Sequence, residues 1–178
     1  KHGEEGRRLR GSVRAPKGWS IYECDYGQIE LRTAAELSGD RAMIAAYVNG
    51  EDIHAKTAHE VLGAPKDRAK QDESKHRLPA KTANFSMLMG TSASGLTTSV
   101  RKAGNMEWSR DCPGCQNWKA PHVNCDSERF IAGWFRVYAG VKAFMDERRA
   151  RAEETARAYG LWGEEWYLPG AWSPHEEV

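Results

Sequence analysis

Residues 21–32 read Ile21-Tyr22-Glu23-Cys24-Asp25-Tyr26-Gly27-Gln28-Ile29-Glu30-Leu31-Arg32. The first part of this stretch is rich in aromatic and β-branched side chains, which favour a strand, and the spacing of apolar residues after Gly27 is that of a helix. The pattern places Asp25 where the strand ends. Strand ends in α/β architectures hold side chains firmly beside an open loop, so Asp25 is well placed to bind a metal ion or a phosphate. The alternative is that Asp25 only caps the helix that follows.

Capping residues and glycines predict a series of short helices after this stretch. Asp40 and Asp52 each stand where a helix cap is needed, and glycines follow the predicted helix ends. The predicted helices cover about residues 28–37, 41–48, 53–62, 78–89, 94–102, 128–138 and 141–159. Residues 1–19 are predicted to be an irregular basic lead-in, 64–76 a surface connection, 104–127 a loop or small inserted module, and 161–169 a strand or hairpin.

The predicted helix 78–89 carries a stripe of residues four positions apart, Arg77, Lys81, Phe85 and Met89. Two cations at a helix N-terminus suit phosphate groups, and an aromatic ring farther along can stack on a base. The alternative is an amphipathic helix with Phe85 and Met89 in the core. Pro79 is tolerated only in a first helical turn, so this helix should begin near Leu78 or be kinked.

The overall charge is close to neutral, with Lys+Arg 26 against Asp+Glu 25 in 178 residues. Basic residues nevertheless gather in two places, and either cluster is a nucleic-acid surface or simply a solvated face. The clusters are Arg7, Arg8, Arg10, Arg14 and Lys17, then Lys66, Arg68, Lys70, Lys75, Arg77 and Lys81. No apolar run approaches the ~18 residues that a membrane span needs, and no signal peptide opens the chain. We therefore expect a soluble, cytoplasmic protein, and a chain that begins at Lys1 and ends at Val178 suggests a fragment.

Three of the four cysteines lie close together with a histidine, as Cys112, Cys115, His122 and Cys125. The spacing C-x2-C-x6-H-x2-C offers four ligands for a tetrahedral, structural Zn²⁺. The alternatives are free thiols in a loop or a redox pair, and the second is disfavoured because no βαβ pattern surrounds the motif. Cys24 is expected to be a small buried residue.

Several motifs together resemble those of family A DNA polymerases, the DNA polymerase I type. They are Asp25 to Arg32, Glu36-Leu37-Ser38-Gly39-Asp40, Glu51-Asp52-Ile53-His54, Lys81-Thr82-Ala83-Asn84-Phe85 and Leu168-Pro169. The resemblance covers nearly the whole chain and implies an α+β fold of the right-hand polymerase type. Its implied parts are a palm segment with strands (1–37), a largely helical fingers subdomain (38–159, with the loop 104–127) and a hairpin returning to the palm (160–178).

The resemblance also implies roles for individual residues. The implied contacts to the deoxynucleoside triphosphate are Tyr26, Gln28, Glu30, His54, Arg77, Lys81 and Phe85, and those to primer-template DNA are Gln28, Arg32 and Met89. His54, Arg77 and Lys81 would hold the triphosphate, and the alternative for His54 is a helix-surface histidine. Phe85 would pack on the sugar and base, and a Phe here implies discrimination against dideoxynucleotides. Glu30 would crowd the sugar 2′ position and so select deoxynucleotides over ribonucleotides. Met89 stands where the family usually has Tyr, and this departure implies altered gating of the templating base.

The implied reaction is phosphoryl transfer from a deoxynucleotide to a primer 3′-hydroxyl, with two Mg²⁺ ions about 4 Å apart. Asp25 would bridge both ions, and the backbone carbonyl of Tyr26 would complete one coordination shell. In the family a second Asp, in a His-Asp-Glu turn, shares this work, and the 178 residues contain no such tripeptide. We therefore expect the chain alone to polymerise poorly or not at all.

Two other functions fit parts of the sequence. A single-subunit RNA polymerase shares the Arg-Lys-aromatic helix, but Glu30 argues against it. A truncated nucleic-acid-binding module without catalysis is supported by the missing second carboxylate and opposed by the presence of Asp25, Lys81 and Phe85.

Overall fold

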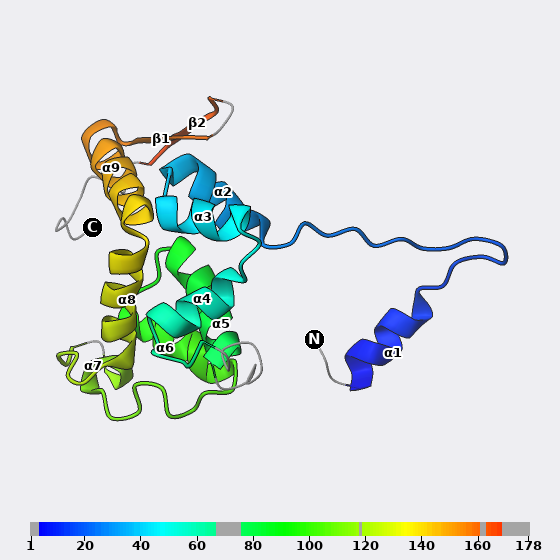
Figure 1. Ribbon diagram of the computed structural model, residues 1–178, viewed down its shortest axis with the longest axis horizontal. Coiled ribbons are helices and arrows are strands. Elements are labelled where there is room, and N and C mark those ends of the chain that lie inside the picture. The colour runs from blue at the N-terminus through cyan, green and yellow to red at the C-terminus, as the bar shows by residue number, and fades with distance from the viewer. Residues whose placement is uncertain (1–3, 67–75, 118, 161–162, 169–178) are drawn as a thin grey trace.

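The computed structural model describes residues 4–66, 76–117, 119–160 and 163–168. Its regular elements are mostly helices (Figure 1). They are α1 (Glu4–Ser12), α2 (Ile29–Ser38), α3 (Arg41–Val48), α4 (Ile53–Glu60), α5 (Leu78–Leu88), α6 (Ala93–Lys102), α7 (Pro113–Gln116), α8 (Asp126–Val137), α9 (Ala139–Thr155), β1 (Arg157–Tyr159) and β2 (Glu165–Tyr167). A mostly helical chain with one small sheet is consistent with the α+β class. Arg68, Lys70, Lys75 and Pro169, which the sequence singled out, lie outside the described residues.

The helix starts follow the predicted caps. The Asp40 side chain accepts a hydrogen bond from the Met43 amide at 2.9 Å, and Asp52 accepts from the His54 and Ala55 amides at 2.9 and 3.2 Å. These bonds satisfy amide groups that a helix N-terminus leaves without intrahelical partners. α5 begins at Leu78 with Pro79 in its first turn, as predicted.

Two predictions for the N-terminal part of the chain are wrong. Residues 4–12 form helix α1, which buries none of its residues and lies apart from the other helices at the end of an extended segment (Figure 1). Residues 21–25 are exposed and form no strand. A strand needs a neighbour to pair with its backbone, and in the described part of the chain the one sheet is the β1–β2 pair.

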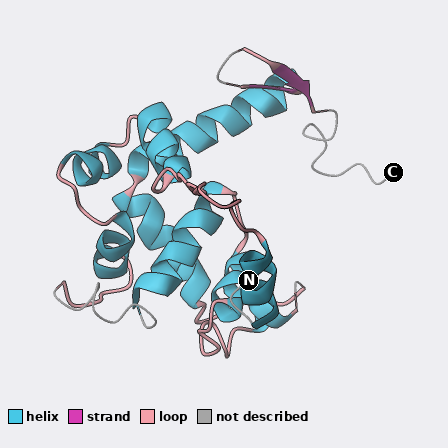
Figure 2. Ribbon diagram, turned by 90° about the vertical axis from the view of Figure 1, so that its right-hand side faces the viewer, coloured by secondary structure: helices cyan, strands magenta, loops and turns pink. Residues whose placement is uncertain are grey.

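Helix α5 lies at the centre of the helical body. It packs between α4 and α6 and also contacts α2. The α2 helix in turn packs against α3 and α9, and α8 lies against α6 and α4. Figure 2 shows the long helix α9 leading out to the hairpin at the edge of the molecule.

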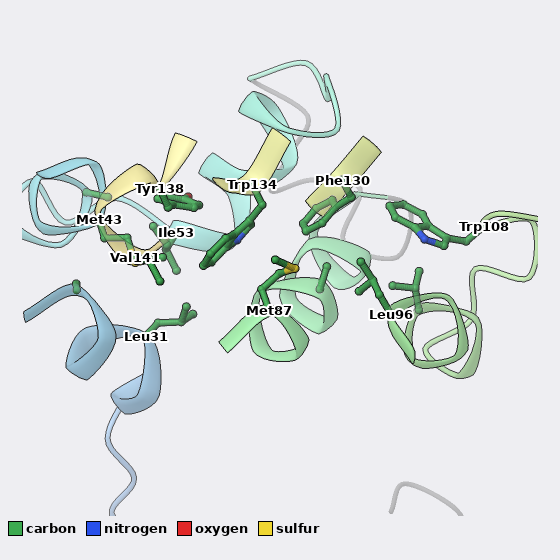
Figure 3. Packing of buried hydrophobic residues seen from close by; sticks show 14 residues of the cluster. Leu31, Met43, Ile53, Met87, Leu96, Trp108, Phe130, Trp134, Tyr138 and Val141 are labelled. Atoms are coloured by element: carbon green, nitrogen blue, oxygen red, sulfur yellow. The ribbon is translucent and has the colours of Figure 1, made fainter. Parts of the chain in front are cut away.

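The core is formed where α8 and α9 cross the shorter helices (Figure 3). Trp134, Tyr138 and Phe130 are its largest fully buried side chains. The Trp134 ring meets the Tyr138 ring edge-on, with ring centroids 5.0 Å apart. Each such side chain removes a large apolar area from water, so this aromatic group supplies much of the packing that holds α5 in place.

The chain from 126 to 168 differs in detail from the prediction. The two predicted helices, about 128–138 and 141–159, are α8 and α9, and the second ends earlier, at Thr155, where Ala156 takes a left-handed conformation. The predicted hairpin near 161–169 is formed by β1 and β2, which pair antiparallel with Ala158 opposite Trp166. The hairpin therefore begins four residues before the predicted start.

Candidate functional site

A cleft of about 640 Å³ runs between the segment that precedes α2 and one face of α5. Residues from four separate parts of the sequence line it. They are residues 25–31, His54, then Arg77, Leu78, Lys81, Thr82, Phe85 and Ser86, and finally Ser99. Every predicted nucleotide contact, together with Asp25, is on this list, whereas Arg32 and Met89 are not.

The cleft face of α5 is exposed and the opposite face is buried. Lys81 is exposed, and Phe85 and Met89 are 51% and 61% exposed. Ala83 and Met87, on the other face, belong to the core. The alternative that Phe85 and Met89 are core residues is therefore wrong. A half-exposed phenyl ring beside an exposed lysine is a surface to which a ligand with a flat, apolar part and a negative part can bind.

Arg77 stands just before α5 and is held by a carboxylate from α4. Its Nε donates to Oδ2 of Asp52 at 2.8 Å, while Oδ1 of Asp52 caps α4. Burial opposes ionisation of Asp52, but the bonds from Arg77 and from the α4 amides outweigh it and hold the pKa of Asp52 below its ordinary value. Asp52 thus fixes Arg77 and the start of the helix that carries His54. The sequence indicated only the capping role.

His54 is buried, not on the helix surface. Trp134 Nε1 donates to Asn84 Oδ1 at 2.7 Å, and the Asn84 amide nitrogen lies 3.0 Å from His54 Nδ1. An indole can only donate, so the Asn84 amide donates to Nδ1 and the ring proton of His54 is on Nε2. Burial lowers the pKa of His54 to about 4, with the charges of Arg77 and Lys81 acting in the same direction and that of Asp52 opposing them. The ring is therefore a neutral N–H donor at pH 7.

The sequence indicated no role for Asn84, which entered only as part of a motif, and none for Trp134. Both are fully buried, and they join α5 and α8 to His54 on α4. Asn84 stands among apolar residues in the predicted helix 78–89, and this is the signal that could have identified the network. A buried amide needs hydrogen-bond partners, so an Asn at such a position indicates a buried polar contact.

The segment before α2 brings a carboxylate to the cleft. Asp25 and Glu30 are exposed, and Tyr26 is 81% exposed. Gln28 has a positive φ of 60°, a conformation that costs a non-glycine residue energy and is found disproportionately at functional sites. Arg32 donates from Nε to the Gly27 carbonyl at 2.9 Å and lies over the Tyr47 ring, so it ties this turn to α3.

The cysteines fall into two groups. The side-chain ligand atoms of Cys112, Cys115, His122 and Cys125 all lie within 4.8 Å of one another, as the spacing predicted. Cys24 is exposed, so the expectation that it is buried is wrong. Within the described part of the chain, the segment before Cys24 pairs with no strand, so it builds no sheet that could cover this side chain.

The cleft thus has side chains suited to binding a phosphorylated ligand. Arg77, Lys81 and neutral His54 can donate to phosphate oxygens, Phe85 can contact a ring, and the carboxylates of Asp25 and Glu30 are hard oxygen ligands that suit Mg²⁺. None of the described helices is both long and apolar enough to cross a membrane.

The chain belongs to DNA polymerase family A, whose family model matches residues 1–177. It is 34% identical over 165 residues to DNA polymerase I of Pseudomonas aeruginosa and 33% identical over 167 residues to that of Bacillus subtilis. Each match covers 93% of this chain and 16% of the relative. It is also 30% identical to the thermostable DNA polymerase I of Thermus aquaticus, over 92% of this chain and 17% of that protein. The chain therefore spans about a sixth of the length of these relatives.

The fold is similar to a solved polymerase domain. That structure is described as the POL domain of Pol1 from M. smegmatis in complex with DNA primer-template and dNTP. The TM-score is 0.70 at 24% sequence identity, covering 98% of this chain and 27% of that one.

Proposed function

We propose that this chain forms the part of a family A DNA polymerase that holds the incoming deoxynucleoside triphosphate. The complete enzyme would add the nucleotide to the 3′-hydroxyl of a primer paired with template DNA. The observation that carries the proposal is the cleft, in which a carboxylate before α2, a histidine on α4 and the cations and aromatic ring of α5 come together. Such an enzyme would act in DNA replication or repair, and its similarity to bacterial enzymes named DNA polymerase I supports the further proposal that it does so in the cytoplasm.

The roles of the cleft residues follow from their chemistry. Arg77 and Lys81 would bind the triphosphate, and His54 would donate from Nε2 without adding charge. Phe85 would pack on the sugar and base, and Glu30 would crowd the sugar 2′ position. Gln28 would lie near the primer-template minor groove.

Arg32 and Met89 do not line the cleft. Arg32 would hold the Gly27 turn in place beside the DNA, and Met89, exposed at the end of α5, would be near the template. In this scheme residues 1–37 belong to the palm and 38–159 to the fingers. The predicted return hairpin, 160–178, lies partly outside the described residues, which here are 160 and 163–168.

Mg²⁺ is the metal that the cleft suits. The exposed carboxylate of Asp25 and the backbone carbonyl of Tyr26 are oxygen donors at the mouth of the site. Bound there, two such ions would stabilise the attacking and leaving oxygens of phosphoryl transfer. Zn²⁺, in contrast, would suit the cysteine and histidine cluster, which takes no part in this reaction.

The 178 residues alone are proposed to synthesise little or no DNA. Asp25 and Glu30 are the acidic residues that line the described cleft, and a two-ion site usually needs further carboxylates. Sustained extension of a labelled primer by this chain alone, at about one nucleotide per second or faster, would contradict this part of the proposal.

The binding of a fluorescent deoxythymidine triphosphate in the presence of Mg²⁺ tests the site directly. Lys81→Ala should weaken binding about tenfold or more, because it loses a charge-assisted hydrogen bond worth about 1.5–3 kcal/mol. Phe85→Ala should weaken it about fivefold or more, because stacking of a base on an aromatic ring is worth about 1–3 kcal/mol. Lys102→Ala is the matched control, since Lys102 is exposed on α6 and does not line the cleft. Equal affinities for all variants would rule out this cleft as the nucleotide site. Competition by uridine triphosphate as strong as by the deoxynucleotide would favour an RNA polymerase instead.

A further inference from the structure

The loop between α6 and α8 brings three thiols and an imidazole together. Cys115 Sγ lies 3.4 Å from Cys125 Sγ and 3.5 Å from His122 Nδ1, and Cys112 Sγ lies 3.4 Å from the same nitrogen. Zinc–sulfur bonds of about 2.3 Å would separate tetrahedral ligands by about 3.8 Å. The four groups are thus already at nearly the spacing that a tetrahedral ion requires. They come from the stretch 112–125, which contains the short helix α7.

The backbone of the loop is shaped to hold this arrangement. The Cys115 amide donates to the Cys112 carbonyl at 3.2 Å, which forms a tight turn between the first two ligands. The Gly114 amide donates to the Pro121 carbonyl at 3.1 Å, which brings the segment before His122 against that turn. A Cβ at Gly114 would lie 2.8 Å from His122 Cγ. Only glycine at position 114 therefore lets the imidazole approach the two thiols without a shift of the loop.

The groups around the ligands suit thiolates. Thr97 Oγ1 on α6 lies 3.1 Å from Cys115 Sγ, and Ser109 Oγ lies 3.6 Å from Cys125 Sγ. Hydroxyl donors of this kind orient metal ligands and stabilise their negative charge. Cys112 and Cys125 are 0% and 4% exposed, so their sulfur atoms have little access to water. A cation bound between these buried thiolates and the histidine would stabilise the negative charge of the sulfur atoms.

We propose that Cys112, Cys115, His122 and Cys125 bind one structural Zn²⁺. Soft thiolates with an imidazole select zinc over Mg²⁺ or Ca²⁺. Four protein ligands leave no coordination position for water or substrate, so the ion has no catalytic role. A disulfide is the less suitable alternative because it would join two of the thiols and leave the third thiol and the histidine facing each other without a partner.

The position of the site indicates what the ion stabilises. Cys125 is the residue before α8, Cys115 lies on α7, and Thr97 links the site to α6. On the same side, Ser127 Oγ accepts from Trp108 Nε1 at 2.8 Å and lies 2.8 Å from Thr97 Oγ1. The ion would therefore fasten the loop to α6 and to the start of α8. The zinc proposal does not depend on the proposed nucleotide site, because none of the four zinc ligands lines that cleft.

Metal content and thiol reactivity test the proposal in the 178-residue chain purified without chelator. We expect one equivalent of zinc by elemental analysis in the wild type and in Cys24→Ser, the matched control with an exposed cysteine outside the cluster. Cys112→Ser and Cys125→Ser should retain less than about a tenth of it. With zinc bound, a thiol reagent should modify Cys24 quickly and the other three thiols only as zinc is released. Removing the metal with a chelator should lower Tm by about 5 °C or more.

Cobalt substitution decides the matter even if the serine variants do not fold. Wild-type protein reconstituted with Co²⁺ should show thiolate-to-cobalt charge-transfer absorption and the intense visible bands of a tetrahedral site. Wild-type and Cys24→Ser proteins that contain no zinc, bind no cobalt and expose four reactive thiols would overturn the proposal. A disulfide between any two of the three clustered cysteines in freshly purified protein would overturn it as well.

Discussion

At the scale of single residues, His54 is the group whose chemistry is most altered by the fold. Its pKa falls from about 6.5 in an unfolded chain to about 4 in the folded one because the ring is buried. The unfolded state therefore binds the proton more tightly. The stability that neutral His54 provides is fully present above about pH 6.5 and is lost as the pH falls towards 4. Between pH 7 and pH 4.5 this loss should amount to about 2–3 kcal/mol.

Urea unfolding of the wild type and His54→Gln at both pH values measures this effect. Glutamine keeps a polar partner for Asn84 but cannot be protonated, so the difference in stability between the two proteins should shrink by about 2–3 kcal/mol on acidification. Other titrating groups, including those of the cysteine cluster, are common to both proteins and cancel in the difference. Two stability curves that stay parallel from pH 7 to pH 4.5 would show that His54 is not the responsible group.

Residue roles that depend on local sequence were predictable, and those that depend on distant contacts were not. Asp40 and Asp52 cap their helices because a cap needs only the next three residues. The ion pair of Asp52 with Arg77 spans 25 positions, and no local pattern indicates it. The convergence of Cys112 with His122 was predictable because ligand spacing within one loop limits where the side chains can lie.

At the scale of elements, the junction between α8 and α9 depends on a close approach to α3. The Gly140 amide donates to Asp40 Oδ2 at 2.8 Å, and a Cβ at Gly140 would lie 2.8 Å from Asp40 Cα. Because the atom in the way is backbone, Gly140→Ala must move α9 away from α3. We expect it to lower the free energy of unfolding in urea by about 1–3 kcal/mol.

Gly11→Ala is the matched control for this substitution. Gly11 is also a helical glycine, but a Cβ there meets nothing within 4 Å. Alanine favours a helix over glycine by up to about 1 kcal/mol, so this variant should be as stable as the wild type or slightly more so. If both alanine variants behave alike, the effect at Gly140 is not due to contact with Asp40.

The elements themselves were predictable where their signals are local. The helix 41–48 was predicted to the residue because a cap, an apolar pattern and a closing Asn-Gly all agree. The strand predicted from Ile21 and Tyr22 is absent, because a strand also needs a partner and the local sequence does not specify one. Helix α1 was missed although Glu4 and Glu5 in its first turn and Arg10 in its last complement the helix dipole.

At the scale of the whole molecule, one chain of hydrogen bonds joins the core to the cleft. Trp134 on α8 donates to Asn84 on α5, which donates to His54 on α4. The position of the proton on His54 is therefore fixed from the core, through Asn84. Trp134 lies in the aromatic core that Figure 3 shows. A substitution of Trp134 would therefore alter both the packing of the core and the N–H donor that His54 presents to the cleft.

Trp134→Phe separates these two effects. The variant keeps an aromatic ring but leaves Asn84 Oδ1 buried without its donor, which should cost about 1–3 kcal/mol of stability in addition to the smaller ring's lost packing. Asn84 is then free to rotate, and His54 no longer has to carry its proton on Nε2. On the proposed function, affinity for a deoxynucleoside triphosphate should fall several-fold. Phe130→Leu, in the same core cluster but outside the nucleotide cleft, should lose comparable stability with unchanged affinity. A loss of affinity that simply follows stability in both variants would mean that packing, not the hydrogen-bonded network, links core and cleft.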